Sequence, residues 1–318
     1  MTQPVEPPHV PVMLAETLDY LNIRPDGAYV DCTAGAGGHS EAIARQLNQG
    51  RLLALDRDPN AVALAAERLA PFPTATVVHA DYREVAKAVA ESGLGLLDGV
   101  LIDAGVSSMQ LDTASRGFSF QADGPLDMRM DPTQGLSALE MLEAMTQDDI
   151  AAMLRAYGDI RPAGRIARVI RERADAGTLV TTGDLASAVS EALDLGGKRA
   201  EETRAVFQAV RIAVNDELRG LADALASAAP LLRPGGRLVV IAFHSGEDRV
   251  AKLALRELAR VRRELHPDGR VKQTHPPLLK VLTPSPVAPS PGELRTNPRS
   301  KSARMRAAER TEALAPQE

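Results

Sequence analysis

The chain has 318 residues, of which 44% are hydrophobic and 25% are charged, the balance of an ordinary globular protein. This length predicts one large domain or two smaller ones. No run of about 18 apolar residues is present, so we expect no transmembrane helix. The first eight residues have neither a basic nor an apolar stretch, so we expect no signal peptide. The single cysteine, Cys32, excludes an internal disulfide and a multi-cysteine zinc site, and it fits a reducing, cytoplasmic compartment.

Charge is unevenly distributed along the chain. The formal net charge of −5 argues by itself against a nucleic-acid partner. Between Arg249 and Arg310, however, 15 Lys and Arg residues stand against 5 Asp and Glu, a local net charge of +10. A basic segment on an acidic body indicates either a polyanionic partner or a solvated basic tail.

Five short apolar runs predict strands of a parallel sheet, because strands buried on both faces are apolar without alternation. They are residues 28–31, 52–56, 76–81, 100–103 and 238–244. Helical stretches separate the first four, an order typical of βαβ units. Ligands of such sheets bind beyond the carboxyl ends of the strands. Those ends carry Asp31, Asp56, Asp81, Asp103 and His244.

The stretch between the fourth and fifth runs is far longer than one crossover helix needs. We therefore expect a small helical domain inserted over residues 110–205, with residues 1–109 and 206–318 forming the sheet domain. Residues 181–185 are expected to start one of the inserted helices, with a Thr or Asp as its cap. Residues 201–230 are expected to return the chain to the sheet as helix, and Leu232–Gly236 to form the turn before the fifth strand.

The C-terminal part of the chain is rich in proline, which cannot continue helices or central strands. From about residue 266 we expect an extended arm that wraps the surface or lies partly loose. Its end, residues 297–306, is strongly basic.

A glycine-rich turn, residues 31–40, follows the first predicted strand. Glycines at such a turn let a ligand approach the backbone. Asp56 lies 19 residues beyond Gly37 at the end of the next strand, where a carboxylate can accept hydrogen bonds from both hydroxyls of a ribose. The pairing is compatible with a nucleotide or with S-adenosylmethionine, and a turn needed only for packing is the alternative. Neither a clean GxGxxG nor a GxxxxGK[ST] motif is present, which disfavours dinucleotide binding and phosphate-loop NTPase chemistry.

Asp103 ends the fourth predicted strand and would face the ribose site. Its carboxylate could accept a hydrogen bond from an amino group of the cofactor or of the acceptor, or it could only cap the turn through Gly105. In the loop that follows, Phe118 and Phe120 stand beside arginines. These rings could stack on a base while an arginine holds a phosphate, or they could fill the junction between domains.

His244 and Ser245 follow the fifth predicted strand. One cysteine and six scattered histidines predict no metal site. A hydrolase is disfavoured because no GxSxG elbow is present.

Together these blocks resemble one family of enzymes. From His9 to Ser300 the chain is similar to the bacterial S-adenosylmethionine-dependent methyltransferases that modify N4 of a cytidine in small-subunit ribosomal RNA, the RsmH or MraW family. The blocks that carry the resemblance are Gly37–Ser40, Asp56–Pro59, Gly105–Ser108, residues 116–131, Phe207–Asn215 and His244–Arg249. The chain departs from the family pattern at Ala104, Asp159–Ile160, Arg199–Arg204 and Gly246.

The resemblance implies the class I methyltransferase fold, a doubly wound and mainly parallel α/β sheet with an inserted helical domain for substrate recognition. It implies S-adenosylmethionine as cofactor, 16S ribosomal RNA or the assembled small ribosomal subunit as partner, and no metal or membrane, in a monomer or homodimer. The cofactor-binding residues it implies are Gly37, Gly38, His39, Asp56, Tyr82, Asp103 and Gln110, with Asp103 also catalytic. The RNA-binding residues that we expect are Phe118, Phe120, Arg129, Arg204, Arg211, His244 and Arg249.

Three other functions stay open at this point. The chain could be a methyltransferase with a different acceptor, a nucleotide-dependent oxidoreductase on a doubly wound sheet, or a non-catalytic ribosome-assembly factor that keeps the cofactor fold.

Overall fold

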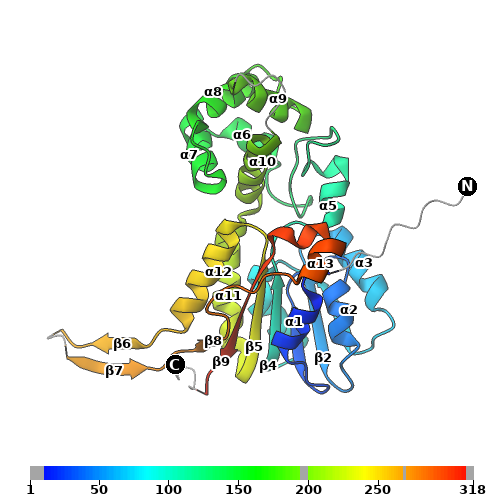
Figure 1. Ribbon diagram of the computed structural model, residues 1–318, viewed down its shortest axis with the longest axis vertical. Helices are drawn as coiled ribbons and strands as arrows, with labels where there is room; N and C mark the ends of the chain where they lie inside the picture. Colours follow the sequence, from blue (N-terminus) through cyan, green and yellow to red (C-terminus); the bar gives the residue numbers. More distant parts are fainter. Residues whose placement is uncertain (1–10, 194–199, 268–269, 313–318) are drawn as a thin grey trace, which may run out of the picture. The chain divides into compact units, whose positions relative to one another are not determined.

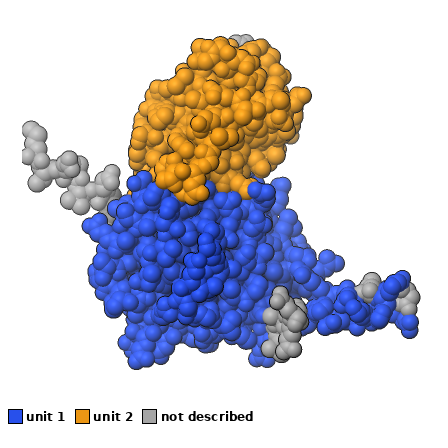
Figure 2. Space-filling model, turned by 180° about the vertical axis from the view of Figure 1, so that it is seen from behind, with its two compact units in different colours: residues 1–105, 218–318 blue, residues 106–217 orange. Residues whose placement is uncertain are grey.

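The computed structural model describes residues 11–193, 200–267 and 270–312 (Figure 1). The chain divides into two compact units, residues 1–105 with 218–318 and residues 106–217, which we call unit 1 and unit 2 (Figure 2). The predicted limits of the insertion, 110–205, are narrower than those of unit 2. Helix α10 (Ala200–Asn215) accounts for the later end, because its apolar residues Val206 and Val210 are buried in the core of unit 2. In the part of the chain described, no helix is long and apolar enough to cross a membrane.

Unit 1 is built on a seven-stranded sheet in the order β3-β2-β1-β4-β5-β9-β8. The first five strands of this order are parallel, and β9 runs antiparallel to both β5 and β8. The predicted doubly wound, mainly parallel α/β sheet is thus confirmed. The strands are β1 (Ala28–Asp31), β2 (Arg51–Asp56), β3 (Ala75–His79), β4 (Leu97–Asp103), β5 (Leu232–Ala242), β8 (Leu279–Val281) and β9 (Arg304–Arg310).

Helices cover both faces of this sheet. The helices α1 (Leu14–Leu21), α2 (Gly38–Ala44) and α3 (Pro59–Leu69) bury apolar side chains against one face. The helices α4 (Val85–Ser92), α11 (Glu217–Ala228) and α12 (Ser245–Leu258) do so against the other. Unit 1 also contains α13 (Pro291–Thr296) and a separate ribbon of two strands, β6 (Arg262–Leu265) and β7 (Val271–His275). Burial from both sides explains why the strand sequences are continuously apolar.

The fifth strand differs from its prediction at both ends. β5 includes residues 232–236, which were expected to form a turn before the strand. Leu232 pairs with Leu97 and Arg237 pairs with Gly99, so residues 233–236 bulge out of the ladder. His244 lies beyond the strand and caps α12 instead.

The C-terminal segment is not the extended, partly loose arm that the prolines predicted. β9 lies between β5 and β8, with Met305 and Ala307 fully buried. Two of its cations, Arg306 and Arg310, are only 5% exposed, and the guanidinium of Arg306 donates to both oxygens of Asp248 at 2.7 and 3.0 Å. The prediction failed because the arginines of β9 were interpreted as solvent-exposed. Arg306 is instead buried and forms an ion pair with Asp248.

Unit 2 is helical and has its own apolar core. Its helices besides α10 are α5 (Ser108–Asp112), α6 (Ala138–Ala144), α7 (Gln147–Gly158), α8 (Ala163–Asp175) and α9 (Thr182–Ala192). The hydroxyl of Thr181 caps α9 as predicted, by accepting the backbone N–H of Asp184. The expected helical return over residues 201–230 is two helices, because Asp216 between α10 and α11 adopts a left-handed backbone with φ of 50°.

Candidate active site

Three carboxylates lie at the carboxyl ends of adjacent strands in unit 1. Asp31 ends β1, which pairs with β2 on one side and with β4 on the other. Asp56 and Asp103 end those two neighbours. Burial is the main cause that raises the pKa of both Asp56 and Asp103, and the nearby charge of Asp31 adds to it in each case. This edge of the sheet therefore attracts a cation.

Asp31, to which the sequence assigned no role, holds the glycine-rich turn in place. Its carboxylate is fully buried and accepts hydrogen bonds from the backbone N–H of Thr33 at 3.1 Å and from the hydroxyl of Ser40 at 2.6 Å. The hydroxyl of Thr33 in turn accepts the backbone N–H of Asp103 at 2.6 Å. Its position at a strand end was the only signal that could have indicated this role.

The glycines of the turn serve different purposes. Gly37, with φ of 80°, has the left-handed backbone that starts α2, and a Cβ there would lie 3.3 Å from the Cα of Ala65. Gly35, with φ of 54°, has no atom within 4 Å of where its Cβ would be, so its backbone is open to a ligand. A Cβ on Gly38 would lie 2.5 Å from the Cγ of Pro11, so its role is close packing.

The carboxylate of Asp56 joins this turn to the end of β2. One oxygen accepts the N–H of Gly35 and the other accepts the N–H of Asp58, each at 2.8 Å. Burial is the main cause that raises the pKa of Asp56, to about 6, and these two hydrogen bonds offset it only in part. Each oxygen keeps a lone pair, so the carboxylate can still accept from the two hydroxyls of a ribose.

Asp103 and His39 meet at the centre of this edge. The Nδ1 atom of His39 lies 3.6 Å from Oδ2 of Asp103, and its Nε2 lies 3.0 Å from the carbonyl oxygen of Val12. Because a carbonyl only accepts, that Nε2 carries a proton and Nδ1 faces Asp103. Burial lowers the pKa of His39, and burial followed by the charges of Asp31 and Glu247 raises the pKa of Asp103 well above its ordinary value.

The other oxygen of Asp103 has no partner among the residues described. Its Oδ1 is buried and accepts no hydrogen bond from the described part of the chain. The alternative that Asp103 merely caps the turn at Gly105 therefore lacks the hydrogen bond it requires. A buried acceptor without a donor is unfavourable, and it marks a position where a ligand can donate one.

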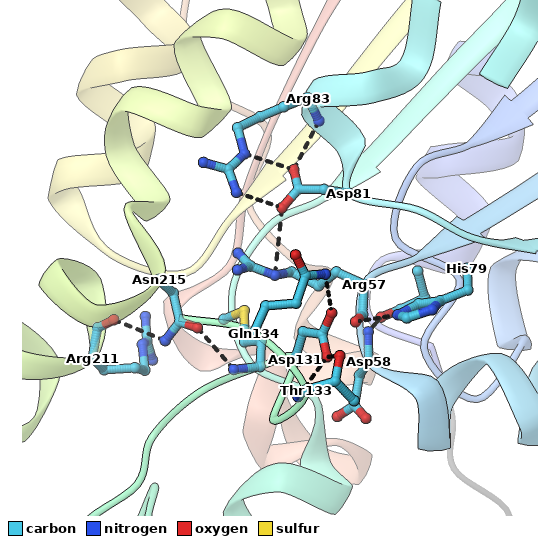
Figure 3. Close-up of polar contacts among 12 residues, drawn as sticks. Arg57, Asp58, His79, Asp81, Arg83, Asp131, Thr133, Gln134, Arg211 and Asn215 are labelled. Carbon is cyan, nitrogen blue, oxygen red and sulfur yellow. Dashed lines mark hydrogen bonds and ion pairs between the residues drawn. The ribbon is translucent and has the colours of Figure 1, made fainter. Parts of the chain in front are cut away.

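Asp81 and Tyr82, the two positions after the loop that ends β3, both make contacts within unit 1, and the role of Tyr82 in the cofactor pocket stays a prediction. The carboxylate of Asp81 is held by Arg83 at 2.9 Å and lies 3.4 Å from Arg57 (Figure 3). Although burial opposes it, the hydrogen bonds from Arg83 and the charge of Arg57 lower the pKa of Asp81. Asp81 is thus already neutralised by arginines, unlike the three carboxylates above. The hydroxyl of Tyr82 lies 3.2 Å from where a Cβ on Gly220 of α11 would be, so Tyr82 packs against that helix.

Gln110 belongs to unit 2. It is buried, and its Oε1 accepts the backbone N–H of Ser107 at 3.0 Å while the hydroxyl of Ser107 accepts the N–H of Gln110. This capping box begins α5. The contribution of Gln110 to the cofactor pocket stays a prediction.

The aromatic loop of unit 2 is packed rather than open. Phe118 is only 5% exposed, with the guanidinium of Arg116 over its ring at 5.8 Å, and its stacking on a base stays a prediction. Phe120 is half-buried and makes an edge-to-face contact with Phe207, with ring centroids 5.1 Å apart. Arg129 donates to both oxygens of Asp127 at 2.8 and 2.7 Å, so its charge is already compensated.

The end of α10 holds the same loop in place through Asn215. The side chain of Asn215 donates to the carbonyls of Met128 and Arg211, and its Oδ1 accepts the N–H of Met130 at 2.8 Å (Figure 3). The guanidinium of Arg211 is bound to Glu217 at 2.8 and 2.9 Å. Arg211 therefore stabilises the helix ending instead of offering a free charge to RNA.

Of the remaining residues that were predicted to bind RNA, His244 has a structural role, whereas Arg204 and Arg249 are exposed. The Nδ1 of His244 accepts the N–H of Gly246 at 3.1 Å, which makes this histidine the cap of α12. Arg204 and Arg249 are exposed, so both stay available for a phosphate. Arg199, one of the positions where the sequence departs from the family pattern, lies outside the described residues. His9, where the similarity to the family begins, also lies outside them.

The edge of unit 1 fits S-adenosylmethionine better than a dinucleotide. S-adenosylmethionine carries a sulfonium and an ammonium group, and the three carboxylates and the unsatisfied Oδ1 of Asp103 favour positive charge and a donor. A dinucleotide would bring phosphates against the same carboxylates, which argues against an oxidoreductase. Asp56 would hold the ribose, the open backbone at Gly35 would admit the cofactor, and Asp103 would accept from its donor group.

Unit 1 has a doubly wound sheet in which β9 is antiparallel to its neighbours. Carboxylates at its strand ends face a glycine-rich turn. These features define a class I S-adenosylmethionine-dependent methyltransferase. A family model described as the MraW methylase family matches residues 6–311. The chain belongs to this family.

Curated relatives align with nearly the whole chain. The ribosomal RNA small subunit methyltransferase H of Methylococcus capsulatus is 47% identical over 302 residues, which cover 94% of this chain and 99% of the relative. The proteins of the same name from Hydrogenovibrio crunogenus and Heliobacterium modesticaldum are 46% and 45% identical, and each match covers 95% of this chain. In those two relatives the match covers 96% and 98% of their own length.

Proposed function

We propose that this protein transfers a methyl group from S-adenosylmethionine to the exocyclic amine N4 of a cytidine in 16S ribosomal RNA of the small ribosomal subunit. The relatives named above support the class of RNA. The family resemblance of the sequence supports the cytidine and its N4 atom. The observation that carries the proposal is the buried Oδ1 of Asp103, which has no donor among the described residues and belongs to the last residue of β4, at the edge where sheets of this kind bind ligands.

The bound cofactor supplies an electrophilic methyl group, so the protein must position the amine rather than activate it with a strong base. Cytosine N4 is a poor nucleophile because its lone pair is delocalised into the ring, and alignment of the reacting atoms supplies much of the rate. Asp103 can accept a hydrogen of the amine or of the cofactor, and the His39 ring lies beside its carboxyl group, with Nδ1 3.6 Å from Oδ2. When the amine loses a proton after transfer, Asp103 or water can take it.

Unit 2 is the part of the protein that we propose to recognise the RNA. Arg155, Arg161 and Arg165, on and beside α7 and α8, are exposed and make no ion pair within the described part of the chain. Arg204, at the start of α10, is also exposed. Unpaired arginines are suited to phosphate groups. The proposal places the protein with ribosomes in the cytoplasm, as a monomer or homodimer.

The experiment that tests this function compares ribosomal RNA from cells with and without the gene. Mass spectrometry of nucleosides from the small subunit should show an N4-methylated cytidine that disappears with the gene. It should return with the wild-type gene or with Asp26→Asn, which changes an exposed carboxylate, but not with Asp103→Asn. An unchanged cytidine profile in the deleted strain would refute the proposed function.

A further inference from the structure

One face of α12 carries a row of positive charges. Arg249, Lys252 and Arg256 lie three or four residues apart on the helix, Arg260 follows just beyond its end, and all four are exposed. Residues at this spacing share one side of a helix, so the row presents about one cation per turn of 5.4 Å. Leu255 and its neighbours on the opposite face are buried in the core of unit 1.

The carboxylates of this helix do not neutralise the row. Asp248 is taken up by the buried Arg306, and Glu257 lies 4.0 Å from Arg260 at the far end. Within the described residues, no ion pair involves the first three cations of the row. A helix face that merely stays soluble normally alternates the two signs of charge, whereas this face has one sign along most of its length.

The row continues onto the ribbon formed by β6 and β7. In both figures this ribbon projects from the body of unit 1 (Figures 1 and 2). Arg263 on β6 is exposed and has no ion-pair partner in the described part of the chain, and residues 270–274 across from it are exposed as well. A two-stranded ribbon with solvent on both faces is only marginally stable by itself. A bound partner would supply the contacts that it lacks.

We propose that this basic row, Arg249, Lys252, Arg256, Arg260 and Arg263, binds the phosphate backbone of the substrate RNA outside the target nucleotide. This inference rests on the proposed function. The helix starts just after β5, at the edge of the sheet that carries the candidate active site, and leads away from it. The helical part of the row, from Arg249 to Arg256, is roughly 10 Å long at 1.5 Å per residue, and Arg260 and Arg263 extend the row beyond the helix. The protein therefore binds a segment of several nucleotides. A short oligonucleotide around the cytidine would contact only part of the basic row.

The test reverses charge in the middle of the row with the double variant Lys252→Glu, Arg256→Glu. Its matched single variants are Arg256→Glu within the row and Lys87→Glu on α4, an exposed lysine outside it. Binding of a protein-free fragment of small-subunit ribosomal RNA is titrated at several salt concentrations. Loss of two phosphate contacts should reduce the slope of log affinity against log salt by about 1.4 to 1.8 and weaken binding about tenfold at low salt. Arg256→Glu should show about half of the slope change, and Lys87→Glu none.

Two further measurements separate RNA binding from other effects. Affinity for S-adenosylmethionine and the melting temperature should stay at wild-type values in all variants, and methyl transfer to isolated small subunits should show a raised KM with unchanged kcat. RNA binding by the double variant that matches Lys87→Glu would overturn the inference. Weaker binding to whole subunits together with unchanged binding to protein-free RNA would also overturn it, because a ribosomal protein would then be the partner. If the wild-type protein methylates no ribosomal RNA, the proposed function fails instead.

Discussion

Replacing Asp56 by asparagine should change how the stability of the protein depends on pH. The pKa of Asp56 is about 6 in the folded protein, against an ordinary value of 3.8. The folded state therefore holds this proton more tightly than the unfolded chain. The contribution of the group to stability is fully present below about pH 3.8 and is lost as the pH rises through about 6.

The size of the effect follows from the same two values. A shift of roughly two pKa units corresponds to about 3 kcal/mol between the protonation states, and roughly 1.4 kcal/mol of it falls between pH 5 and pH 8. Asparagine has no charge to bury, but it has one acceptor oxygen where Asp56 offers two. Either Gly35 or Asp58 then loses its acceptor, at a pH-independent cost of about 1 to 2 kcal/mol.

Urea unfolding of wild type and Asp56→Asn at pH 5, 6, 7 and 8 measures this directly. The variant should gain stability relative to wild type by about 1.4 kcal/mol across this range. Asp26→Asn, an exposed carboxylate of the same unit, should follow the wild-type curve. A stability difference between Asp56→Asn and wild type that stays constant with pH would show that the carboxylate is not destabilised by its burial.

The affinity for S-adenosylmethionine tests Asp56 a second time, and it should change with pH in the direction opposite to stability. Hydroxyl groups of a ribose donate to the ionised carboxylate, so binding of S-adenosylmethionine should weaken by up to about tenfold per pH unit below pH 6. Calorimetry of Asp56→Asn should find at least about 2 kcal/mol of affinity lost at pH 7.5. Unchanged affinity in the variant would remove Asp56 from the cofactor site.

Asp103→Asn should reduce both methyl transfer and S-adenosylmethionine affinity, because we propose that the unsatisfied Oδ1 accepts a hydrogen bond from a ligand; a variant normal in both assays would contradict this. Arg306→Leu leaves the partly exposed Asp248 without its partner and should destabilise unit 1 by about 1 to 3 kcal/mol, seen as a lower urea midpoint. Removal of residues 304–318 takes away β9 and should leave no cooperative unfolding transition in unit 1, whereas a solvated tail would leave the transition intact. Gly38→Ala places a Cβ 2.5 Å from the Cγ of Pro11 and should lower the melting temperature.

The central sheet could be predicted because its strands are buried on both faces. Apolar runs ending in Asp31, Asp56 and Asp103 mark both the strands and the edge where we propose that the cofactor binds. The chemistry of that edge, however, depends on the surroundings of each aspartate, and these surroundings differ from one aspartate to the next. Nothing local in the sequence distinguishes Asp56, which accepts only backbone N–H groups, from Asp81, which arginines neutralise.

The sequence was least informative where a charged side chain finds its partner far along the chain. Arg306 pairs with Asp248 on α12, which the ribbon, β8 and α13 separate from β9 along the chain, and the alternation around Arg306 looked like a basic tail. Nearby partners were missed as well. Arg129 and Arg211 were expected to bind phosphates, but Arg129 pairs with Asp127 and Arg211 pairs with Glu217. Counting charges predicts where cations are abundant, but only the fold shows which of them are free.

The position of β9 has a consequence for how the protein is made. β5 needs β9 on its outer side, but β9 follows it in the chain only after α12, the ribbon, β8 and α13. While the chain is being synthesised, β5 therefore has one unpaired edge, the kind of surface to which other strands add. Unit 2 is a continuous segment that emerges before β5, so it can fold during synthesis. Unit 1 must wait for β9, and the nascent protein should be most prone to aggregation, and most dependent on chaperones, in that interval.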